Sequence, residues 1–359
     1  MDNTKILPVS NILKDTPPYR HGGDIYNNDV KYDFSVNTNP LGLPPIVKRK
    51  LIENTDVFAR YPDIQCRQLC EAVSVNENIP GDNLLFGNGA SEIFKLIADV
   101  VKPRKALVTA PSFLGYSHVL NGTGAGIEYY YLEEEKNFVL DTDIIGKIPA
   151  GCDMVFLCSP CNPTGRVISK NVLLSVLLYC EENHIYLVVD ECFLGFVPDY
   201  ESLSMKNRLD SNYLIIVNAF TKLYAMAGLR LGWCACGNRE LLTEMRRMQP
   251  EWSVSVPAQL AGIYALKDKE YIARTREVVQ QERVKMAGFF EDMGIKVFPS
   301  DANFLLVKSK INLYEKLLAR HVLIRWCSNF TGLSDEFYRI AIRSAGENKI
   351  FIKILTEVL

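Results

Sequence analysis

Hydrophobic and polar positions alternate with different periods along this chain, and the change of period divides it into three parts. Residues 1–45 are rich in Pro, Gly and Asn and show no clear period, which is typical of an irregular arm. Residues 46–240 begin with two helical patterns and continue with short apolar runs that alternate with further helical patterns. Residues 241–359 carry helical patterns followed by short strands and closing helices. We therefore predict an N-terminal arm, a large domain and a smaller C-terminal domain.

The apolar runs of the second part predict one mostly parallel sheet. Each run is short and nearly continuous, and most are followed by a helical pattern, as in strands that helices cover on both faces. The predicted strands are, in chain order, LLFGN, KALVTA, GIEYYYL, DMVFLC, IYLVVD, YLIIVNAF and LGWCAC. The predicted fold class is therefore α/β. Functional groups in such a sheet gather at the carboxyl ends of its strands, so chemistry is expected in the residues that follow these runs.

The last part of the chain predicts a smaller α+β domain. A long helical pattern over 269–292 joins it to the large domain, after two shorter helical patterns over 238–248 and 256–266. The segments IKVF, FLLVK, VLIRW and YRIAIR predict strands, and 311–319 and 346–357 predict helices. We expect this domain to pack against the large one, with the N-terminal arm contributing to it and to the active site.

Composition argues against several classes of partner. The 359 residues are 48% hydrophobic and 23% charged, which is ordinary for a globular protein with a large core. The formal net charge is −2, so no broad basic surface is expected, and neither nucleic acid nor an anionic membrane is an expected partner. The first residues, MDNTKILPVS, lack an apolar signal core, and no apolar run approaches the roughly 18 residues of a membrane span. We therefore expect a cytoplasmic protein.

Ten cysteines raise the questions of disulfides and of metal binding. Cys158 and Cys161 form a C-x-x-C in LCSPCNPTGR, a pattern found in redox pairs and in halves of metal sites. A zinc site needs about four ligands, but no second C-x-x-C occurs and the four histidines are scattered. Most cysteines lie in apolar runs, where cysteine acts as a small buried hydrophobe. We expect no metal and no disulfides. A second interpretation of the same stretch is a strand that leads into an NPTG turn bearing Asn162.

A glycine-rich turn follows the first predicted strand. Gly87-Asn88-Gly89-Ala90-Ser91 opens a helical pattern, and a helix N-terminus binds anions because its free N–H groups and its dipole both favour negative charge. Such a turn often serves only as a helix cap, and Ser91 would suit that task. Gly89, Ala90 and Ser91 are therefore candidate ligands of an anionic group.

Five further side chains come from segments that follow the other predicted strands. They are an aromatic ring, an amide, a carboxylate and two cations: Phe113, Asn162, Asp190, Lys222 and Arg230. Each has an ordinary explanation alone, such as core packing for the ring, although a carboxylate at the end of a buried strand needs some partner. Together they match pyridoxal 5′-phosphate, which needs a lysine for a Schiff base, a carboxylate for the pyridinium nitrogen, a stacking face and a phosphate cradle.

Three segments resemble the fold-type-I pyridoxal-phosphate enzymes, namely SPCNPTG, VVDECF and TKLYAMAGLRLG. The resemblance is strongest to the histidinol-phosphate aminotransferase-like group and, within it, to the threonine-phosphate decarboxylases of cobalamin side-chain synthesis. Further resembling segments are HGGD, DFSVNTNPLG, RYPD, GNGASE, PEWSV and LIRWCSNFTGLSDEFYRIAIRSAGEN. The resemblance spans nearly the whole chain. It implies a mostly parallel seven-stranded sheet in the large domain, a smaller α+β domain, and pyridoxal 5′-phosphate as cofactor.

The resemblance also implies a role for each residue of the cofactor site. Lys222 is expected to hold the cofactor as a Schiff base, Asp190 to pair with the ring nitrogen, and Asn162 to bond the 3′-oxygen. Phe113 is expected to stack on the ring. The cofactor phosphate is expected to contact Gly89, Ala90, Ser91, Thr221, Arg230 and, from the neighbouring subunit, Tyr61. The resemblance therefore implies a homodimer with shared active sites.

The substrate side of the resemblance implies a small phosphorylated amino acid. Arg339 matches the arginine that binds the α-carboxylate, with a salt bridge at a strand edge as the ordinary alternative. Arg325 matches an arginine associated with the substrate phosphate. Strand alternation puts Arg343 on the same face as Arg339, where it either assists the phosphate or has a structural role. The other candidate substrate ligands are His21, Gly22, Gly23, Asn39 and Asn162.

The implied activity is decarboxylation of L-threonine O-3-phosphate to (R)-1-aminopropan-2-ol O-phosphate. A histidinol-phosphate aminotransferase and a phosphoserine decarboxylase are the alternatives within the same group. Many aminotransferases of this group have a tyrosine three residues after the aspartate, where this chain has Phe193, and this difference favours the decarboxylase. A catalytically silent scaffold would be expected to lose the lysine or the aspartate, and both are present.

Overall fold

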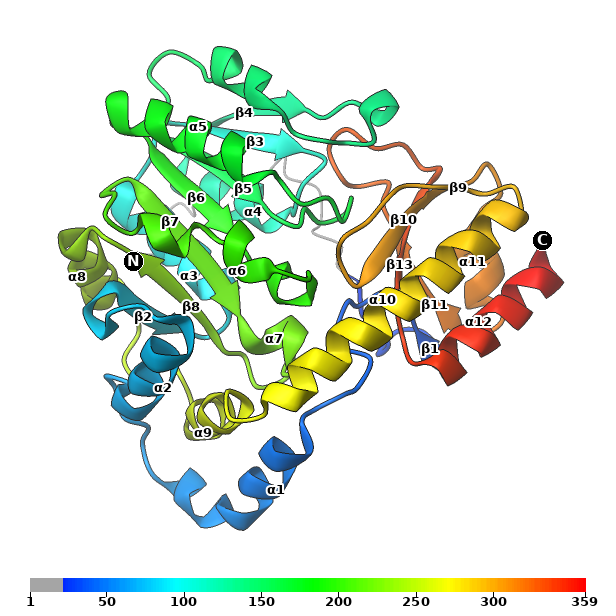
Figure 1. Cartoon of the computed structure of the whole chain (residues 1–359), viewed down its shortest axis with the longest axis horizontal. Coiled ribbons are helices and arrows are strands. Elements are labelled where there is room, and N and C mark those ends of the chain that lie inside the picture. The colour runs from blue at the N-terminus through cyan, green and yellow to red at the C-terminus, as the bar shows by residue number, and fades with distance from the viewer. Residues whose placement is uncertain (1–21) are drawn as a thin grey trace, which may run out of the picture.

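One sheet of seven strands forms the centre of the large domain in the computed structural model, which describes residues 22–359 (Figure 1). The strand order is β2-β8-β7-β6-β5-β3-β4. Only β8 runs antiparallel to its neighbours, so the predicted mostly parallel sheet is confirmed. The strands are β2 (Leu84–Gly87), β3 (Lys105–Ala110), β4 (Gly126–Tyr131), β5 (Met154–Cys158), β6 (Tyr186–Asp190), β7 (Leu214–Ala219) and β8 (Gly232–Cys236).

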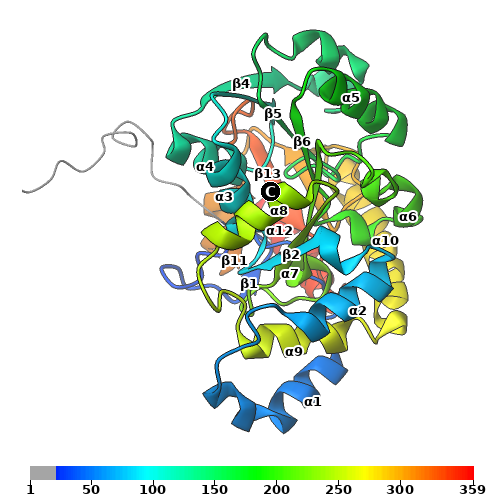
Figure 2. The ribbon, with the colours of Figure 1, turned by 90° about the vertical axis from the view of Figure 1, so that its left-hand side faces the viewer.

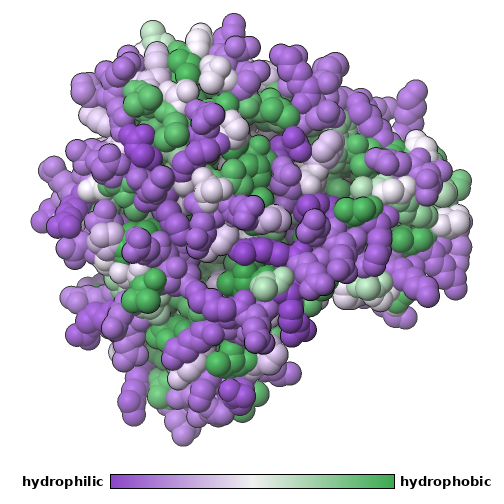
Figure 3. All heavy atoms as spheres, viewed as in Figure 1, coloured by the Kyte–Doolittle hydropathy of each residue, from purple (hydrophilic) through white to green (hydrophobic). Residues whose placement is uncertain are grey.

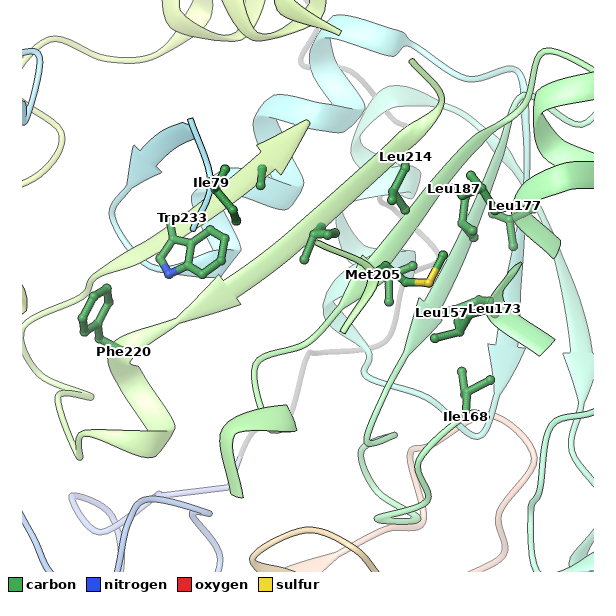
Figure 4. Close-up of a cluster of buried hydrophobic side chains, with 14 of the residues drawn as sticks. Ile79, Leu157, Ile168, Leu173, Leu177, Leu187, Met205, Leu214, Phe220 and Trp233 are labelled. Carbon is green, nitrogen blue, oxygen red and sulfur yellow. The ribbon is translucent and has the colours of Figure 1, made fainter. Parts of the chain in front are cut away.

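Alternate residues of the central strands pack on opposite faces of this sheet. In β6, Leu187 belongs to one hydrophobic cluster and Val188 to another. Figure 4 shows Leu187 and Leu157, from neighbouring strands, beside Leu173 and Leu177 of the covering helix. Because both faces are covered, both sets of side chains must be apolar, which explains the continuous apolar runs in the sequence.

Helices cover the two faces of the sheet (Figure 2). The helices α3, α4 and α8 contribute buried side chains to one cluster, and α2, α5 and α9 contribute to the other. The helices of the large domain are α1 (Pro45–Glu53), α2 (Arg67–Glu77), α3 (Ala90–Val101), α4 (Gly115–Thr123), α5 (Lys170–Glu182), α6 (Tyr200–Leu203), α7 (Phe220–Leu223), α8 (Arg239–Met248) and α9 (Val256–Ala265). The first helical pattern of this domain, over about 46–58, predicts one helix, but α1 ends at Glu53 and a 3₁₀ turn over Thr55–Ala59 follows it.

A four-stranded antiparallel sheet with the order β12-β13-β10-β9 forms the smaller domain. Helices α10, α11 and α12 pack with it, and a two-stranded parallel sheet pairs β1 of the arm with β11. The elements are β1 (Tyr32–Asp33), α10 (Lys269–Asp292), β9 (Lys296–Val297), β10 (Phe304–Lys308), α11 (Leu313–Leu318), β11 (Val322–Leu323), β12 (Arg325–Trp326), β13 (Phe337–Ala341) and α12 (Ala345–Val358).

The predicted strand VLIRW is divided between two sheets. Val322 and Leu323 pair with β1, whereas Arg325 and Trp326 pair with β13. Ile324, between them, is buried in the cluster of the smaller domain. The chain therefore turns from one sheet to the other at this residue, and the turn brings Arg325 next to Arg339, its partner in the ladder.

The helix α10 passes from the large sheet to the smaller domain, as Figure 1 shows. The preceding helices α8 and α9 pack into the hydrophobic clusters of the large sheet. The domain limits 1–45, 46–240 and 241–359 stay a prediction, and this packing favours a boundary closer to the start of α10. Polar residues cover most of the face in Figure 3. Within the described residues, no helix has both the length and the apolar character that crossing a membrane requires.

A buried carboxyl group lies directly after β6. Glu191 is 3% exposed, and its carboxylate accepts hydrogen bonds from Ser204 Oγ at 2.7 Å and from the Met205 N–H at 2.8 Å. Burial disfavours the charged form more than these donors favour it, so the pKa of Glu191 is raised from 4.5 to about 7.

Replacement of Glu191 by Gln is expected to change how stability depends on pH. The folded protein keeps the Glu191 proton to a higher pH than the unfolded chain does. The contribution of Glu191 to stability is therefore fully present below pH 4.5 and is lost as pH rises through about 7. The free energies of unfolding of the unmodified protein and of Glu191→Gln should agree near pH 4.5. At pH 8, Glu191→Gln should be more stable than the unmodified protein by up to about 3 kcal/mol. Urea unfolding of both cofactor-free proteins measures this gap, and parallel pH profiles would contradict the expectation.

Candidate active site

Three predicted site residues follow three neighbouring strands. Asn162 comes after β5, Asp190 ends β6, and Lys222 lies in α7 directly after β7. Within the sheet, Cys158 pairs with Asp190 and Asp190 with Val217, so the three strands end at the same edge. Parallel strands thus bring together an amide, a carboxylate and an amine that lie far apart in the sequence.

A cavity opens at this edge of the sheet, between the large domain, the arm and the smaller domain. Six predicted site residues line it, namely Gly22, Phe113, Asn162, Lys222, Arg325 and Arg339. The remaining lining residues are Ser35, Val36, Leu114 and Phe330. The cavity therefore collects cationic, aromatic and amide side chains from the two domains, and residues of the arm complete its lining.

The carboxylate of Asp190 is buried and held by two donors. The Tyr116 hydroxyl donates to Oδ2 at 2.5 Å, and the Cys192 N–H donates to Oδ1 at 2.9 Å. Burial raises the pKa of Asp190, while the Cys192 and Tyr116 hydrogen bonds and the Lys222 charge act in the opposite direction. A carboxylate has about four acceptor positions, so Asp190 can accept a further N–H.

The amine of Lys222 is activated by its surroundings. Burial is the main cause, and the nearby positive charges of Arg339 and Arg230 add to it, so that the pKa of Lys222 falls from 10.5 to about 8. A substantial share of Lys222 is therefore the neutral, nucleophilic amine near physiological pH. The amine also lies over the Phe193 ring, 5.8 Å from its centroid.

Arg339 is a buried cation that points into the cavity. It is 6% exposed, its Nη2 donates to the Ser35 carbonyl at 2.6 Å, and its Nη1 donates to Asn162 Oδ1. Its Nε has no partner among residues 22–359, and in that range no carboxylate lies within salt-bridge distance of it. Burial lowers the pKa of Arg339 to about 10. A buried guanidinium without a carboxylate partner is suited to bind an anion.

Arg325 lines the same cavity. Its Nη2 donates to Asn329 Oδ1 at 2.7 Å, and its guanidinium lies 5.0 Å from the centroid of the Phe330 ring. The cavity thus holds two guanidinium groups, which belong to neighbouring strands of the small sheet.

The glycine-rich turn lies against Arg230 and β8. Gly89 has a φ of 73°, and a Cβ at this position would lie 2.5 Å from Arg230 Nη2. A Cβ on Gly232 would lie 2.5 Å from the Ala90 nitrogen, so both glycines are needed for this close approach. Gly89 is the N-cap of α3 and no side chain caps the helix, so Ser91 is not the cap. The uncapped N–H groups and the guanidinium together fit an anionic group.

Several predicted residues lie outside the cavity lining. Asn39 is buried and its amide is fully engaged, because Nδ2 donates to the Leu223 carbonyl and to Thr275 Oγ1, and Oδ1 accepts from the Leu41 N–H. Asn39 therefore holds the arm against α7 instead of facing the cavity. Thr221 is buried in α7 next to Lys222.

The other predicted substrate and phosphate ligands have different surroundings. Arg343 pairs with Glu347 at 3.1 Å, which indicates a structural role. The Gly23 N–H donates to Ser35 Oγ at 2.7 Å. Tyr61 is 77% exposed and its ring centroid lies 4.5 Å from that of Trp252. His21 lies outside the described residues.

Two residues of the site did not stand out in the sequence. Tyr116 binds Asp190 and lies in the first turn of α4, three residues after Phe113, which precedes that helix. Ser35 supplies the carbonyl that orients Arg339. A helical wheel of the segment after KALVTA would have drawn attention to Tyr116, but no local pattern marks a backbone carbonyl.

The C-x-x-C motif lies beside the site without forming a metal centre. The thiol of Cys158 donates to the Pro160 carbonyl at 3.2 Å, and that of Cys161 to the Pro111 carbonyl at 3.4 Å. All ten cysteines are free thiols, and most are buried. Over residues 22–359, no three His, Cys, Asp or Glu side chains are grouped so as to hold a metal ion.

Comparison with known proteins agrees with this site. The chain belongs to the aminotransferase class I and II family, whose model matches residues 29–355. It is 34% identical over 354 residues to the threonine-phosphate decarboxylase of Salmonella typhimurium, covering 94% of this chain and 96% of that protein. Both the resemblance and the fold class expected from the sequence are thus confirmed.

Solved structures give the same fold. The histidinol-phosphate aminotransferase of Clostridium acetobutylicum superimposes with a TM-score of 0.85 at 32% identity, covering 91% of this chain and 98% of that one. The L-threonine-O-3-phosphate decarboxylase of Porphyromonas gingivalis superimposes with a TM-score of 0.80 at 23% identity, covering 90% and 98%. This second likeness supports the fold alone.

The residues present fit the cofactor of fold-type-I members of this family, pyridoxal 5′-phosphate. A lysine with a lowered pKa and a buried carboxylate with acceptor capacity to spare lie at the same sheet edge. The uncapped N-terminus of α3 under Arg230 fits a phosphate, and Phe113 at the cavity wall fits a flat ring.

Proposed function

We propose that this protein binds pyridoxal 5′-phosphate and decarboxylates L-threonine O-3-phosphate to (R)-1-aminopropan-2-ol O-phosphate, a precursor for cobalamin biosynthesis. The observation that carries the proposal is the pair of guanidinium groups, Arg339 and Arg325, that share one cavity with Lys222. A phosphorylated amino acid has two anionic groups, and the pair matches both. The similarity over nearly the full chain to a threonine-phosphate decarboxylase supports the same substrate.

The cofactor site is assigned as follows. When bound, pyridoxal 5′-phosphate supplies a ring that accepts the electron pair left on Cα when a bond to it breaks. Lys222 provides the amine, Asp190 accepts a hydrogen bond from the ring nitrogen, and Asn162 donates to the 3′-oxygen. Phe113 provides the stacking face. The phosphate ligands are Gly89, Ala90, Ser91, Thr221 and Arg230.

The two arginines decide which bond breaks. Arg339 binds the α-carboxylate and Arg325 binds the phosphate, so the substrate is held at both ends. Such positioning can lower a barrier by about 7–11 kcal/mol in well-oriented reactions. Carbon dioxide leaves with cleavage of the Cα–carboxyl bond, and the electron pair stays at Cα. Lys222, with a pKa of about 8, is assigned the proton that then replaces the carboxyl group.

A second candidate activity is histidinol-phosphate aminotransfer, which the likeness to the Clostridium acetobutylicum structure favours. Phe193 argues against it, because this side chain lacks the hydroxyl of the tyrosine found there in many aminotransferases of the group. Phe193 instead packs against Phe304, with ring centroids 5.1 Å apart.

Phosphoserine is a close alternative substrate for the decarboxylase, because a pocket discriminates one methyl group by only about 1–3 kcal/mol.

A substrate panel distinguishes these activities. The holoenzyme is incubated separately with phosphothreonine, phosphoserine and histidinol phosphate, each with and without 2-oxoglutarate, and carbon dioxide, amine and keto acid are measured. We expect carbon dioxide and aminopropanol phosphate from phosphothreonine without any amino acceptor. Keto acid from a phosphorylated amino acid, or ketone from histidinol phosphate, formed only in the presence of 2-oxoglutarate and with no carbon dioxide, would establish the aminotransferase instead.

We further propose a cytoplasmic homodimer in which Tyr61 reaches the cofactor phosphate of the neighbouring subunit. Tyr61 and Trp252 support this, because they form an exposed aromatic pair on the surface instead of lining the cavity of their own chain. Light scattering measures the mass, and a monomer that is fully active would contradict the shared site.

A further inference from the structure

Tyr116 contacts both of the groups assigned to hold the pyridine ring. Its side chain is completely buried, its hydroxyl donates to Asp190 Oδ2 at 2.5 Å, and its ring meets the Phe113 ring edge to face with centroids 5.4 Å apart. No other described residue is hydrogen-bonded to the Asp190 side chain except Cys192.

Other aromatic rings hold Tyr116 in this position. The Tyr116 ring stacks on Phe156 of β5 with centroids 5.1 Å apart, and it packs against the edge of Phe94 of α3 at 5.1 Å. These contacts fix the ring from two further elements, so the hydroxyl has little freedom to leave Asp190.

We propose that Tyr116 is a positioning residue that orients the Asp190 carboxylate and the Phe113 ring together, and so sets how strongly the site binds and polarises the cofactor. This inference rests on the proposed function of the site. The hydroxyl donates to one Asp190 oxygen and the Cys192 N–H donates to the other, and together they fix the orientation of the carboxylate. The Tyr116 ring restricts the positions that the Phe113 ring can take.

The hydroxyl also acts on the charge of Asp190. Four ionisable groups face this carboxyl, namely Tyr116 from α4, Cys158 from β5, the neighbouring Cys192, and Lys222 from α7. The hydrogen bonds of Cys192 and Tyr116 and the Lys222 charge lower the pKa of Asp190, against the effect of burial. Without the Tyr116 hydroxyl, the buried carboxylate is less stable as an anion, and a bound pyridinium proton is held less firmly.

The test compares Tyr116→Phe with a matched control, Tyr271→Phe. Tyr271 is also buried, and its hydroxyl donates to the Gly42 carbonyl at 2.5 Å, away from the cavity. Each protein is stripped of cofactor, and pyridoxal 5′-phosphate is titrated back by fluorescence. We expect Tyr116→Phe to bind it about tenfold or more weakly, as for loss of a hydrogen bond to a charged group, and Tyr271→Phe to bind it as the unmodified chain does.

A second measurement separates positioning from packing. Without the Tyr116 hydroxyl, the pyridine ring of the cofactor carries less positive charge. The pH midpoint at which the lysine-bound cofactor changes colour should therefore rise in Tyr116→Phe. In an Asp190→Asn background the same substitution should cost no further cofactor affinity, because its effect passes through the carboxylate. An equal loss in both backgrounds, or an unchanged affinity and midpoint in Tyr116→Phe, would overturn the proposal.

Two results keep the inference distinct from the proposed function. If the unmodified protein binds no pyridoxal 5′-phosphate, the proposed function fails and this inference fails with it. If the unmodified protein binds it and Tyr116→Phe matches it, only the inference fails. Should Tyr116→Phe not fold, 3-fluorotyrosine at position 116 keeps the shape and strengthens the donor. The midpoint should then fall, and an unshifted midpoint contradicts the proposal.

Discussion

Lys222→Ala is expected to lose decarboxylation by at least about a thousandfold, together with the near-visible absorption band of the lysine-bound cofactor. Lys222 is assigned two tasks, attachment of the cofactor and delivery of the proton to Cα, and alanine can do neither. The surroundings support both tasks, because burial and the charges of Arg339 and Arg230 lower the Lys222 pKa to about 8. The same pKa predicts that reconstitution of the cofactor-free protein accelerates as pH rises and levels off above about 8.

An exposed lysine provides the control for this prediction. Lys95 lies on α3 and pairs with Asp99, so Lys95→Ala removes a lysine without touching the cavity. We expect normal colour and turnover from Lys95→Ala. Ethylamine added to Lys222→Ala should restore part of the turnover if the missing group is the amine. Full activity or an unchanged band in Lys222→Ala would contradict the assignment.

Arg339→Met is expected to raise the KM for phosphothreonine about a hundredfold or more, because truncating one member of a buried charge pair costs about 3–5 kcal/mol. In the cofactor-free protein, Arg339→Met should leave the free energy of unfolding nearly unchanged or increase it. Arg339 is a buried cation with an unpartnered Nε, and methionine of similar length removes that desolvation cost. Loss of substrate affinity without loss of stability would distinguish a binding residue from a structural one.

Arg339→Lys and Arg320→Ala complete this comparison. Lysine keeps the charge but not the fork that binds Ser35 and the substrate carboxylate at once, so an intermediate KM is expected. Arg320 pairs with Glu357 at the surface, and its removal should leave the KM unchanged. Steady-state kinetics and urea unfolding supply the two readouts. If Arg339→Met unfolds readily and keeps a normal KM, the arginine is structural.

The residues at the strand ends were predictable because the carboxyl ends of parallel strands lie at the same edge of a sheet. Asn162, Asp190 and Lys222 each follow a continuous apolar run, and the structure brings them to one edge of the sheet. The longer helices were predictable from period, since each has a single buried side, whereas the four-residue helices α6 and α7 are too short to show one. The cofactor and substrate roles came from the resemblance, because residue types alone left an ordinary explanation for each.

What could not be predicted depended on tertiary contacts. The strand VLIRW is continuous in sequence, yet its halves pair with β1 and β13, partners that local propensity does not encode. Arg343 was placed beside Arg339 by strand alternation, but β13 ends at Ala341 and the alternation ends with it. Asn39 is as polar as a ligand, and only the fold reveals that its amide is consumed by α7 and α10.

The pairing of β1 with β11 implies an order of events during synthesis on the ribosome. Tyr32 is among the first described residues to emerge, but its partner Val322 follows about 290 residues later. The Phe34 carbonyl likewise waits for the Ala341 N–H, and the Ser35 carbonyl waits for Arg339. The seven-stranded sheet can therefore form while the arm is still unpaired. A nascent chain becomes competent for substrate only when its final strand emerges, and ribosomal stalling before that point would leave a folded sheet without a closed pocket.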